Sequence, residues 1–395
     1  MTERRRIRVV VLTNVPAPYR FPLFRVLHNR PDLELKVFFT ASSYNNRPWK
    51  PPAEMDFKYR VLPGVTIPMG RILSQDYLYL DINPTAFWEL QHFRPDVVVI
   101  GGYSSLTNLQ TYWQFKLQGK GIVMWGEATD RAEASRIRRL LLPLIRKLYR
   151  KADACLASST SARKLYLSYG VAQDRIFLSP LAADNSFFHS VSRLDSVERV
   201  RIRASLGLTD KPVVLYVGRL VETKGVDLLI DALARLQQEK GIFAHLLLVG
   251  DGPLRPNLER RCRQVGISAH FAGYVEQQYL PRFYGVADVF VLPSYYEPFG
   301  LVLNEAMACQ LPVVVSDRVG AADDLVVNGR NGYIFPAGDC FKLAEALERL
   351  LEDPTLCRAM GHASWEIIKE WDLERAVQGF VDAITLAASN RTARG

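Results

Sequence analysis

Two cations flank a predicted strand-to-helix connection in the second half of the sequence. Arg219 follows Gly218 at the end of a strand-like run, and Lys224 precedes Gly225 at the start of a helix-like segment. A helix N-terminus already favours an anion, because its first backbone N–H groups lack partners within the helix. The pattern fits a diphosphate site, although an arginine and a lysine beside a loop are most often only solvated.

Two carboxylates follow the next strand-like run, residues 289–293. Glu297 falls in the strand-to-helix connection, and Glu305 falls between one and two turns into the helix, with Gly300 between them. Glu297 could face a bound group while Glu305 reaches another part of the same ligand, and Gly300 would let the backbone come close. The aliphatic neighbours of Glu305 predict a buried helix, where a carboxylate needs a partner such as a ligand hydroxyl. The alternative is that Glu297 complements the helix dipole and Glu305 lies on a solvated face.

Three segments of this half together resemble the retaining glycosyltransferases of family 4. They are Gly-Arg-Leu-Val-Glu-Thr-Lys-Gly (218–225), Val-Gly-Asp-Gly-Pro (249–253) and Glu-Pro-Phe-Gly-Leu-Val-Leu-Asn-Glu-Ala-Met-Ala (297–308). The resemblance is continuous over residues 213–335 and looser elsewhere. It implies an α/β protein of GT-B fold, with two facing Rossmann-like domains, parallel sheets and an interdomain cleft. It also implies front-face transfer from a nucleotide sugar with retention of configuration, and neither a metal nor a cofactor.

The resemblance implies a role for each matching residue. Arg219 and Lys224 would bind the donor diphosphate and offset the charge that grows on the leaving nucleotide. Glu297 would contact the sugar hydroxyls, and Glu305 would accept a hydrogen bond from the ribose. The other residues expected to line the donor site are Gly218, Gly250, Tyr274, Val275, Phe299, Gly300 and Leu301.

The first half departs from the family pattern after its first strand. Many members carry a glycine-rich loop there, whereas this chain has Pro16 and Pro18, which lack N–H groups for binding a phosphate. Tyr19 and Arg20 could bind substrate through their side chains instead. A rigid turn before a helix is the alternative interpretation of the proline segment.

A second departure lies at Glu127, which takes the place of a histidine that the family often has at the end of a later strand. A carboxylate there could act as an acceptor base or orient a hydroxyl, or it could only be an acid at a helix N-terminus. Tyr103, at another strand end, is expected to line the acceptor site. The expected acceptor is a saccharide or a lipid-linked saccharide of cell-envelope polysaccharide or lipopolysaccharide synthesis.

The basic charge of the chain is concentrated in its first half. The net charge is +9, with 27 basic against 15 acidic residues in 1–190 and 23 against 26 in 191–395. Residues 131–151 hold eight basic side chains, one acid and helically spaced leucines, a pattern typical of a helix that binds an anionic membrane surface. The alternative is that the leucines pack on the domain and the cations are solvated. Pro143 argues against one straight helix.

Three other functions fit parts of the sequence less well than sugar transfer does. A hydrolysing epimerase of UDP-sugars shares the GT-B fold but does not predict the Glu-Pro-Phe-Gly segment. A nucleic-acid binder would explain the basic half, but the chain has no helix-turn-helix, RNA-recognition or zinc signature, so we expect no nucleic acid. An oxidoreductase is disfavoured, because no Gly-x-Gly-x-x-Gly follows the first strand.

The elements that must position these residues are buried strands alternating with amphipathic helices. The expected strands are residues 8–13, 35–40, 96–101, 122–125, 154–158, 176–179, 213–218, 245–250, 270–272, 289–293, 313–317 and 333–335. Residues 182–210 show no strand pattern. We therefore expect an acceptor-side domain at 1–190, a nucleotide-sugar domain at 191–370, and a C-terminal helix crossing back to the first domain within 371–395.

Composition narrows the class of protein further. With 48% hydrophobic and 23% charged residues, the chain fits a globular protein and not a disordered one. The five cysteines are scattered and the six histidines lack ligand spacing, so we expect no disulfide and no metal. The apolar run near the N-terminus is too short for a signal peptide. We expect a cytoplasmic protein, peripheral on the inner face of the cytoplasmic membrane.

Overall fold

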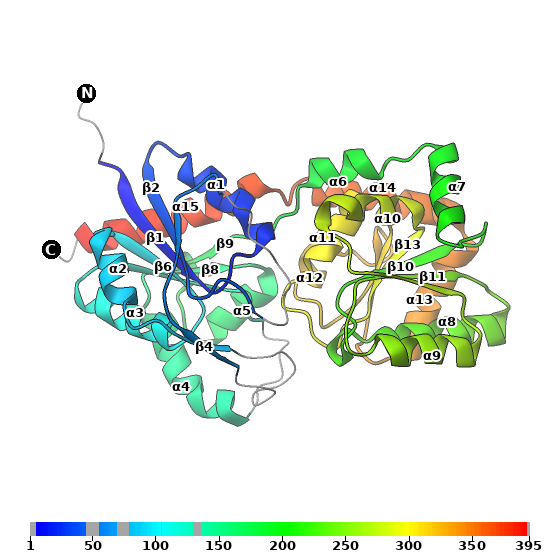
Figure 1. Ribbon diagram of the computed structural model, residues 1–395, viewed down its shortest axis with the longest axis horizontal. Coiled ribbons are helices and arrows are strands. Elements are labelled where there is room, and N and C mark those ends of the chain that lie inside the picture. Colours follow the sequence, from blue (N-terminus) through cyan, green and yellow to red (C-terminus); the bar gives the residue numbers. More distant parts are fainter. Residues whose placement is uncertain (1–4, 45–54, 69–78, 104, 130–135, 393–395) are drawn as a thin grey trace. The chain divides into compact units, whose positions relative to one another are not determined.

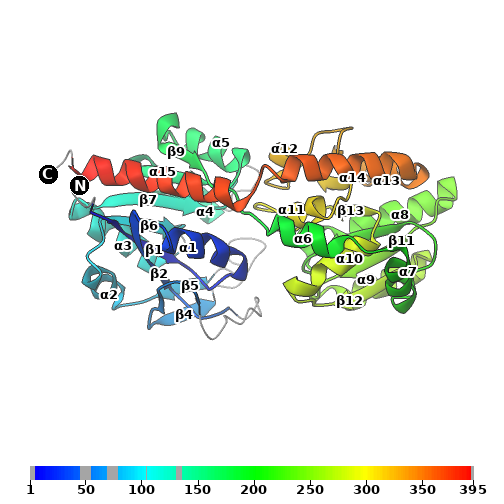
Figure 2. The same cartoon turned by 90° about the horizontal axis from the view of Figure 1, so that it is seen from above.

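The computed structural model describes residues 5–44, 55–68, 79–103, 105–129 and 136–392, which form two compact units (Figures 1 and 2). Unit 1 takes its residues from 1–181 and 373–395, and unit 2 is the continuous segment Ala182–Asp372. The boundary expected at residue 190 falls inside helix α6 (Asn185–Ser192), which belongs to unit 2.

Unit 1 is built on a seven-stranded parallel sheet. Its strand order is β3-β2-β1-β6-β7-β8-β9. The strands are β1 (Ile7–Thr13), β2 (Leu33–Phe39), β3 (Tyr59–Val61), β6 (Val97–Gly101), β7 (Gly121–Gly126), β8 (Ala154–Ala157) and β9 (Ile176–Leu178). A separate antiparallel pair is formed by β4 (Val65–Pro68) and β5 (Tyr79–Ile82).

Helices cover both faces of this sheet. Alternate residues of β1 face opposite sides, as the two-residue period of a strand requires: Val9 and Val11 pack into one core, and Val10 and Leu12 into the other. The first core includes α1 (Phe21–His28) and α15 (Leu373–Thr392). The second includes α2 (Ala86–His92), α3 (Leu106–Leu117), α4 (Arg136–Lys151) and α5 (Thr160–Ser168).

Unit 2 repeats the plan with six parallel strands. Their order is β12-β11-β10-β13-β14-β15. The strands are β10 (Val213–Val217), β11 (His245–Val249), β12 (Ala269–Gly273), β13 (Val289–Leu292), β14 (Val313–Ser316) and β15 (Gly332–Phe335). The helices of eight or more residues are α6, α7 (Ser196–Ser205), α8 (Val226–Lys240), α9 (Arg255–Val265), α11 (Leu301–Ala308), α13 (Cys340–Glu352) and α14 (Pro354–Ile368), and the shorter ones are α10 (Leu280–Val286) and α12 (Ala322–Leu325).

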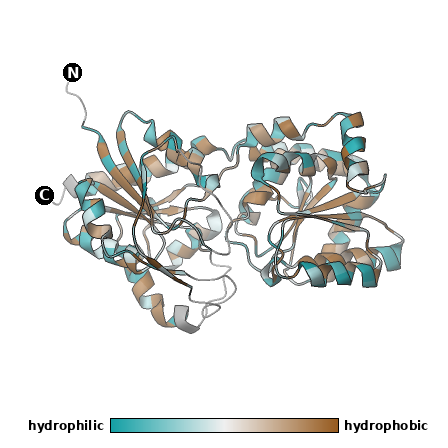
Figure 3. Ribbon diagram, viewed as in Figure 1, coloured by the Kyte–Doolittle hydropathy of each residue, from teal (hydrophilic) through white to brown (hydrophobic). Residues whose placement is uncertain are grey.

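The twelve strands predicted from the sequence are all present, and both sheets are parallel. The central strands are apolar along their whole length because helices cover both faces, as the hydropathy colouring shows (Figure 3). In unit 1 the strands that follow β1 are added on one side of it as far as β3, and β6 then starts the other side. The order of strands in the sheet therefore reverses between β1 and β6, and in unit 2 it reverses between β10 and β13. The two-domain Rossmann-like architecture is thereby confirmed, and ligands of such sheets bind outside the carboxyl ends of the strands at the reversal.

The last helix, α15, completes the core of unit 1. Its buried residues recur every three or four positions and include Phe380, whose ring lies 5.0 Å from that of Trp125. Gly379 brings the helix against β9, since a Cβ there would lie 1.9 Å from the carbonyl oxygen of Leu178. Ser179 also donates a hydrogen bond of 2.9 Å to the carbonyl of Ala376.

No helix among the described residues has the length and apolar character needed to cross a bilayer.

A Gly379→Ala variant tests this close approach. In an ordinary helix interior the change would stabilise by about 0.5–1 kcal/mol. Here the added methyl group overlaps the Leu178 carbonyl, so we expect a loss of about 1–3 kcal/mol or more in the free energy of unfolding. Urea denaturation monitored by tryptophan fluorescence measures it. The matched control is Gln378→Ala, at an exposed neighbouring position, where we expect a change within about 0.5 kcal/mol. A more stable Gly379→Ala protein would contradict the packing of α15 on β9.

Candidate functional site

The donor-side residues lie at the carboxyl edge of the sheet of unit 2. β10 pairs with β11 on one side and with β13 on the other, so the connections that follow these three strands meet at one place. The connection after β10 contains Arg219 and Lys224, and the connection after β13 contains Glu297. The sheet thus brings together three side chains that are up to 78 positions apart in sequence.

Glycines allow these connections to contact each other backbone to backbone. Gly250, which follows β11, has φ of 132°, and a Cβ there would lie 1.9 Å from the carbonyl oxygen of Gly218. Gly225, with φ of 62°, approaches the carbonyl oxygen of Pro293 in the same way, at 2.3 Å from the Cβ position. The backbone N–H of Tyr295 adds a 2.9 Å hydrogen bond to Thr223. Side chains at these glycines would force the connections apart.

Lys224 and Glu297 form an ion pair across this contact. Nζ of Lys224 lies 2.5 Å from Oε2 of Glu297, and both side chains are mostly buried, with 17% and 16% of their surface exposed. Burial raises the pKa of Tyr216 well above its usual value, and the negative charge of Glu297 adds to that shift. The Tyr216 hydroxyl donates to the carbonyl of Arg219 at 2.8 Å, which fixes the backbone of that residue. The cation and the carboxylate predicted to bind donor are therefore partners in this structure.

The helix after Glu297 begins at the predicted place. Gly300 precedes α11 with φ of 97°, a conformation that favours glycine, and Leu301 is the first helical residue. Phe299 is buried and its carbonyl accepts from the N–H of Ala321 at 3.0 Å. The N-terminal N–H groups of α11 thus start beside Glu297, as expected for contacts with a sugar or a phosphate.

Glu305 is buried, as its apolar neighbours predicted, but it has a protein partner that the sequence did not reveal. The hydroxyl of Tyr284, on α10, donates to Oε2 of Glu305 at 2.8 Å. Burial raises the pKa of Glu305 to about 7, while hydrogen bonds from Tyr284 and Gln277 oppose that shift. Tyr284 and Glu305 are 21 positions apart, with a strand and a loop between them, so no sequence pattern indicates this pair.

The residues predicted near the base lie where β11 and β12 end. The N–H of Gly250 donates to the carbonyl of Gly273 at 2.7 Å, which ties the two strand ends together. Tyr274, the next residue, is 59% exposed, and Val275 follows it. Tyr274 is thus exposed next to the strand end that Gly250 holds.

Three of the acceptor-side residues of unit 1 contact one another. Arg20 Nη2 lies 2.6 Å from Oε1 of Glu127, and the Tyr19 hydroxyl lies 3.5 Å from the same oxygen. Tyr103 instead packs edge-on against the ring of Tyr149, with centroids 6.3 Å apart. Pro18 begins a short 3-10 helix that leads into α1, so the proline segment forms a turn before a helix.

The basic segment forms α4, and its leucines do not share one environment. Ile145 and Leu148 are buried in the core, whereas Leu140, Leu141 and Leu144 are 80%, 44% and 42% exposed. Pro143 lies within the helix. Arg131 and Glu133 lie outside the described residues, as do the side chains of Arg136 and Arg138.

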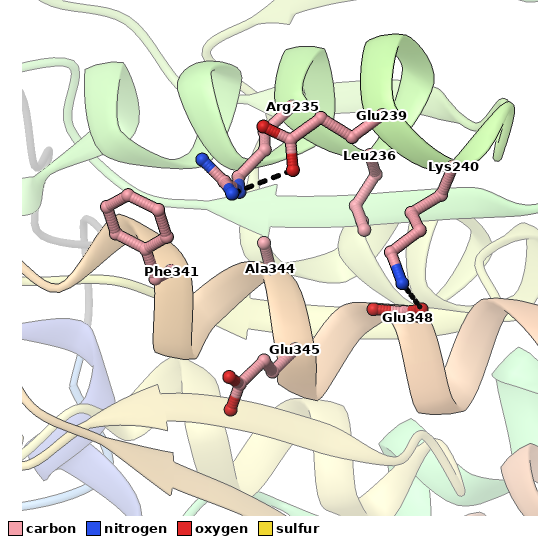
Figure 4. Close-up of a pocket in the computed structure, with 8 residues that line it drawn as sticks. All are labelled: Arg235, Leu236, Glu239, Lys240, Phe341, Ala344, Glu345 and Glu348. Carbon is pink, nitrogen blue, oxygen red and sulfur yellow. Dashed lines mark ion pairs between the residues drawn. The ribbon is translucent and has the colours of Figure 1, made fainter.

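A pocket between α8 and α13 offers no competing site (Figure 4). It lies about 15 Å along α8 from the Lys224 end, at a rise of about 1.5 Å per residue. Four of its charged residues form the pairs Arg235–Glu239 and Lys240–Glu348, and the fifth, Glu345, pairs with Lys342 outside the lining.

The match to a known family falls within unit 2. Residues 198–366 match the model of the family described as "Glycosyl transferases group 1". The chain is 29% identical to sulfoquinovosyl transferase SQD2 of Arabidopsis thaliana over 311 residues, 76% of this chain and 58% of that protein. It is 36% identical to the lipopolysaccharide core biosynthesis glycosyltransferase LpsE of Rhizobium meliloti over 173 residues, 43% of this chain and 48% of that protein. It therefore spans about half the length of these relatives.

The fold has close counterparts among solved structures. The crystal structure of Anabaena Alr3699/HepE in complex with UDP has a TM-score of 0.74 and 19% identity, covering 96% of this chain and 100% of HepE. At that identity the likeness concerns the fold, and it confirms the predicted GT-B class.

The pH dependence of stability in a Glu305→Gln variant tests whether burial raises the pKa of Glu305. The pKa of Glu305 is about 7 in the folded protein, above its usual value of 4.5. Protonation of Glu305 therefore contributes fully to the free energy of unfolding below about pH 4.5, and this contribution is lost as the pH rises to about 7. A glutamine does not titrate. The free energy of unfolding of Glu305→Gln should therefore rise relative to wild type between pH 5 and pH 8, by up to about 3 kcal/mol.

Urea denaturation at the two pH values measures this difference. The control is Glu345→Gln, at an exposed residue paired with Lys342, which should show no such rise. If the free energies of unfolding of Glu305→Gln and wild type differ by the same amount at both pH values, the pKa of Glu305 is not raised.

Proposed function

We propose that this protein transfers a sugar from a nucleoside diphosphate to a saccharide or lipid-linked acceptor. The match of residues 198–366 to the glycosyl transferases group 1 model supports this proposal. In this proposal unit 2 binds the donor and unit 1 binds the acceptor. The donor, the pathway and the retention of configuration are parts of the proposal, as is catalysis without a metal.

The Lys224–Glu297 ion pair is the observation that best supports this function. It holds one positive and one negative group at the edge where α8 and α11 begin. The diphosphate of a donor would compete with Glu297 for Lys224, and the released carboxylate could then accept hydrogen bonds from sugar hydroxyls. A bifunctional ligand with an anionic part and a hydroxyl-rich part fits both groups at once. A nucleotide sugar is such a ligand.

The transfer step needs positive charge where the leaving nucleotide becomes more negative. Arg219 and Lys224 would supply it from fixed positions, together with the N-terminal N–H groups of α11. Glu305, held by Tyr284, would meet the ribose, and the backbone from Gly250 to Val275 at the strand ends would meet the base. HepE binds UDP in its crystal structure, which supports a nucleoside diphosphate as the ligand class.

The relatives support a role in the cell envelope. LpsE is named for lipopolysaccharide core biosynthesis. We therefore place the acceptor among envelope saccharides and the reaction on the inner face of the cytoplasmic membrane.

The α4 surface, defined as Leu140, Leu141, Leu144 and the exposed cations that follow them, is proposed as the contact with that membrane. The three leucines are exposed although Ile145 and Leu148 of the same helix are buried, so the domain core does not account for them. Arg146, Lys147, Arg150 and Lys151 are exposed on the same helix, whose sequence contains no acid. Exposed leucines beside cations match the apolar interior and the anionic headgroups of a bilayer.

A donor screen and two variants test the site. Wild-type protein is tested by differential scanning fluorimetry with UDP, GDP, ADP and their sugars, and transfer is then measured with the stabilising donor. Arg219→Ala and Lys224→Ala should each lower kcat at least about 100-fold, since each removes charge that stabilises the transition state. Glu297→Gln should bind the nucleoside diphosphate more tightly, because Lys224 loses its competitor, yet it should transfer poorly.

The matched control is Lys240→Ala, which removes the lysine of a remote ion pair in unit 2 and should leave kcat unchanged. Near-normal transfer by both Arg219→Ala and Lys224→Ala would overturn the site. Epimerised sugar formed without any acceptor would instead identify an epimerase.

Vesicle binding tests the α4 surface. Wild-type protein should sediment with vesicles of phosphatidylcholine mixed with phosphatidylglycerol and much less with phosphatidylcholine alone. Changing Arg146, Lys147, Arg150 and Lys151 to glutamine should weaken binding at low salt at least tenfold, at about 1 kcal/mol per cation. Changing the three leucines to serine should weaken it at every salt concentration.

The control replaces Lys342 and Lys369, exposed cations of unit 2, by glutamine and should bind as wild type. Equal binding to both kinds of vesicle, or no effect of the α4 substitutions, would refute the membrane contact.

A further inference from the structure

The Arg20–Glu127 ion pair joins two connections of unit 1 whose strands are not neighbours. Arg20 lies in the connection after β1, and Glu127 follows β7, while β6 lies between these strands in the sheet. The pair therefore reaches across the carboxyl end of β6. Ligands of parallel sheets bind at this edge, and the order of the sheet reverses between β1 and β6.

Both terminal nitrogens of Arg20 are held by the protein, while its buried Nε has no hydrogen-bond partner among the described residues. Nη1 donates to Oγ1 of Thr13 at 2.6 Å, Nη2 donates to Oε1 of Glu127 at 2.6 Å, and the guanidinium carbon lies 4.4 Å from the centroid of the Trp125 ring. Only 12% of the side chain is exposed. A buried cation held from three sides is poorly placed to bind an incoming anion, so Arg20 acts through the groups that it touches.

A glycine at the end of β6 leaves room for this arrangement. A Cβ on Gly101 would lie 3.1 Å from Oγ1 of Thr13, the atom that accepts from Arg20. Gly102 then donates to the carbonyl of Trp125 at 2.8 Å, which ties the end of β6 to β7. The space between the two connections is thus kept free of side chains from β6 itself.

Glu127 keeps one carboxylate oxygen for a ligand. Within the part of the chain that the structure describes, Arg20 and Tyr19 both contact Oε1, and nothing donates to Oε2. The side chain is 24% exposed, which leaves it accessible from solvent. A carboxylate oxygen accepts hydrogen bonds and repels anions, so this position suits a hydroxyl group and not a phosphate.

We propose that Arg20 is a positioning residue that holds Glu127 so that the second oxygen of its carboxylate accepts a hydrogen bond from a hydroxyl of the saccharide acceptor. This assignment rests on the proposed function and deepens it. It gives Arg20 no direct contact with substrate, whereas Glu127 contacts the acceptor and sets which hydroxyl is presented.

A double-mutant cycle tests the assignment. The variants are Arg20→Ala, Glu127→Ala, the double variant, and Arg20→Lys, with octyl glucoside, octyl mannoside and octyl galactoside as acceptor probes. Transfer is measured against acceptor and donor concentration, and hydrolysis of the donor is measured without acceptor. The double variant removes both charges together, so it guards against a single variant that fails to fold because a charge has lost its partner.

We expect Arg20→Ala and Glu127→Ala each to raise the acceptor KM at least tenfold, with the donor KM and donor hydrolysis within about twofold of wild type. The double variant should match Glu127→Ala, because Arg20 acts only through Glu127. Arg20→Lys should recover part of the loss, since a lysine keeps the charge but offers fewer directed donors. The control is Arg30→Ala, which breaks an exposed ion pair with Asp32 and should leave every constant unchanged.

Additive effects in the double variant, or equal changes in donor and acceptor KM, would overturn the positioning role. A wild-type protein that binds a nucleotide sugar but transfers it to none of the octyl glycosides would overturn the assignment of a saccharide hydroxyl to Glu127. A protein that binds no nucleotide sugar would overturn the proposed function itself.

Discussion

The close approach of Gly225 to the carbonyl of Pro293 is the constraint on which the donor side of this protein depends. It holds the connection after β10 against the connection after β13, which brings Lys224 within ion-pair distance of Glu297. The left-handed conformation of Gly225 and the absence of a Cβ are both needed, since any other side chain there would press on the backbone of Pro293. The parallel sheet supplies the rest, by placing β10 and β13 side by side.

The two units use ion pairs in different ways. Lys224 and Glu297 lie in the connections after two neighbouring strands, and in the proposed function a donor would replace their ion pair by its own contacts. Arg20 and Glu127 follow strands that are not neighbours, and the guanidinium of Arg20 packs over the ring of Trp125. A ligand could therefore break the Lys224–Glu297 pair. The Arg20–Glu127 pair would persist on binding, with Oε2 of Glu127 left to accept a hydrogen bond.

The sequence predicted the parts of the structure that depend on local pattern. All twelve expected strands are present, and the inner ones were the clearest in the sequence because a strand buried on both faces is apolar throughout. The burial of Glu305 followed from its aliphatic neighbours, but its partner Tyr284 did not, since hydrogen bonds between distant helices leave no periodicity. The pairing of Arg20 with Glu127, 107 residues apart, was hidden for the same reason.

The leucines of α4 show a second limit of pattern alone. Helical spacing placed Leu148 on one apolar stripe with Leu140, Leu141 and Leu144, yet of these four only Leu148 reaches the core. Spacing gives the direction in which a side chain leaves the helix axis. It does not give how much of the helix is covered by the core of unit 1.

The assignment of α15 to unit 1 has a consequence for how the chain acquires its structure during synthesis. Unit 2 is one continuous stretch, and every residue of its core is translated before α15. The face of the first sheet that Val377, Phe380 and Ile384 cover must wait for them, although its strands were translated first. N-terminal domains usually fold first during translation, but here the later domain can finish before the earlier one. Until then the nascent chain carries an apolar sheet face that a chaperone would recognise.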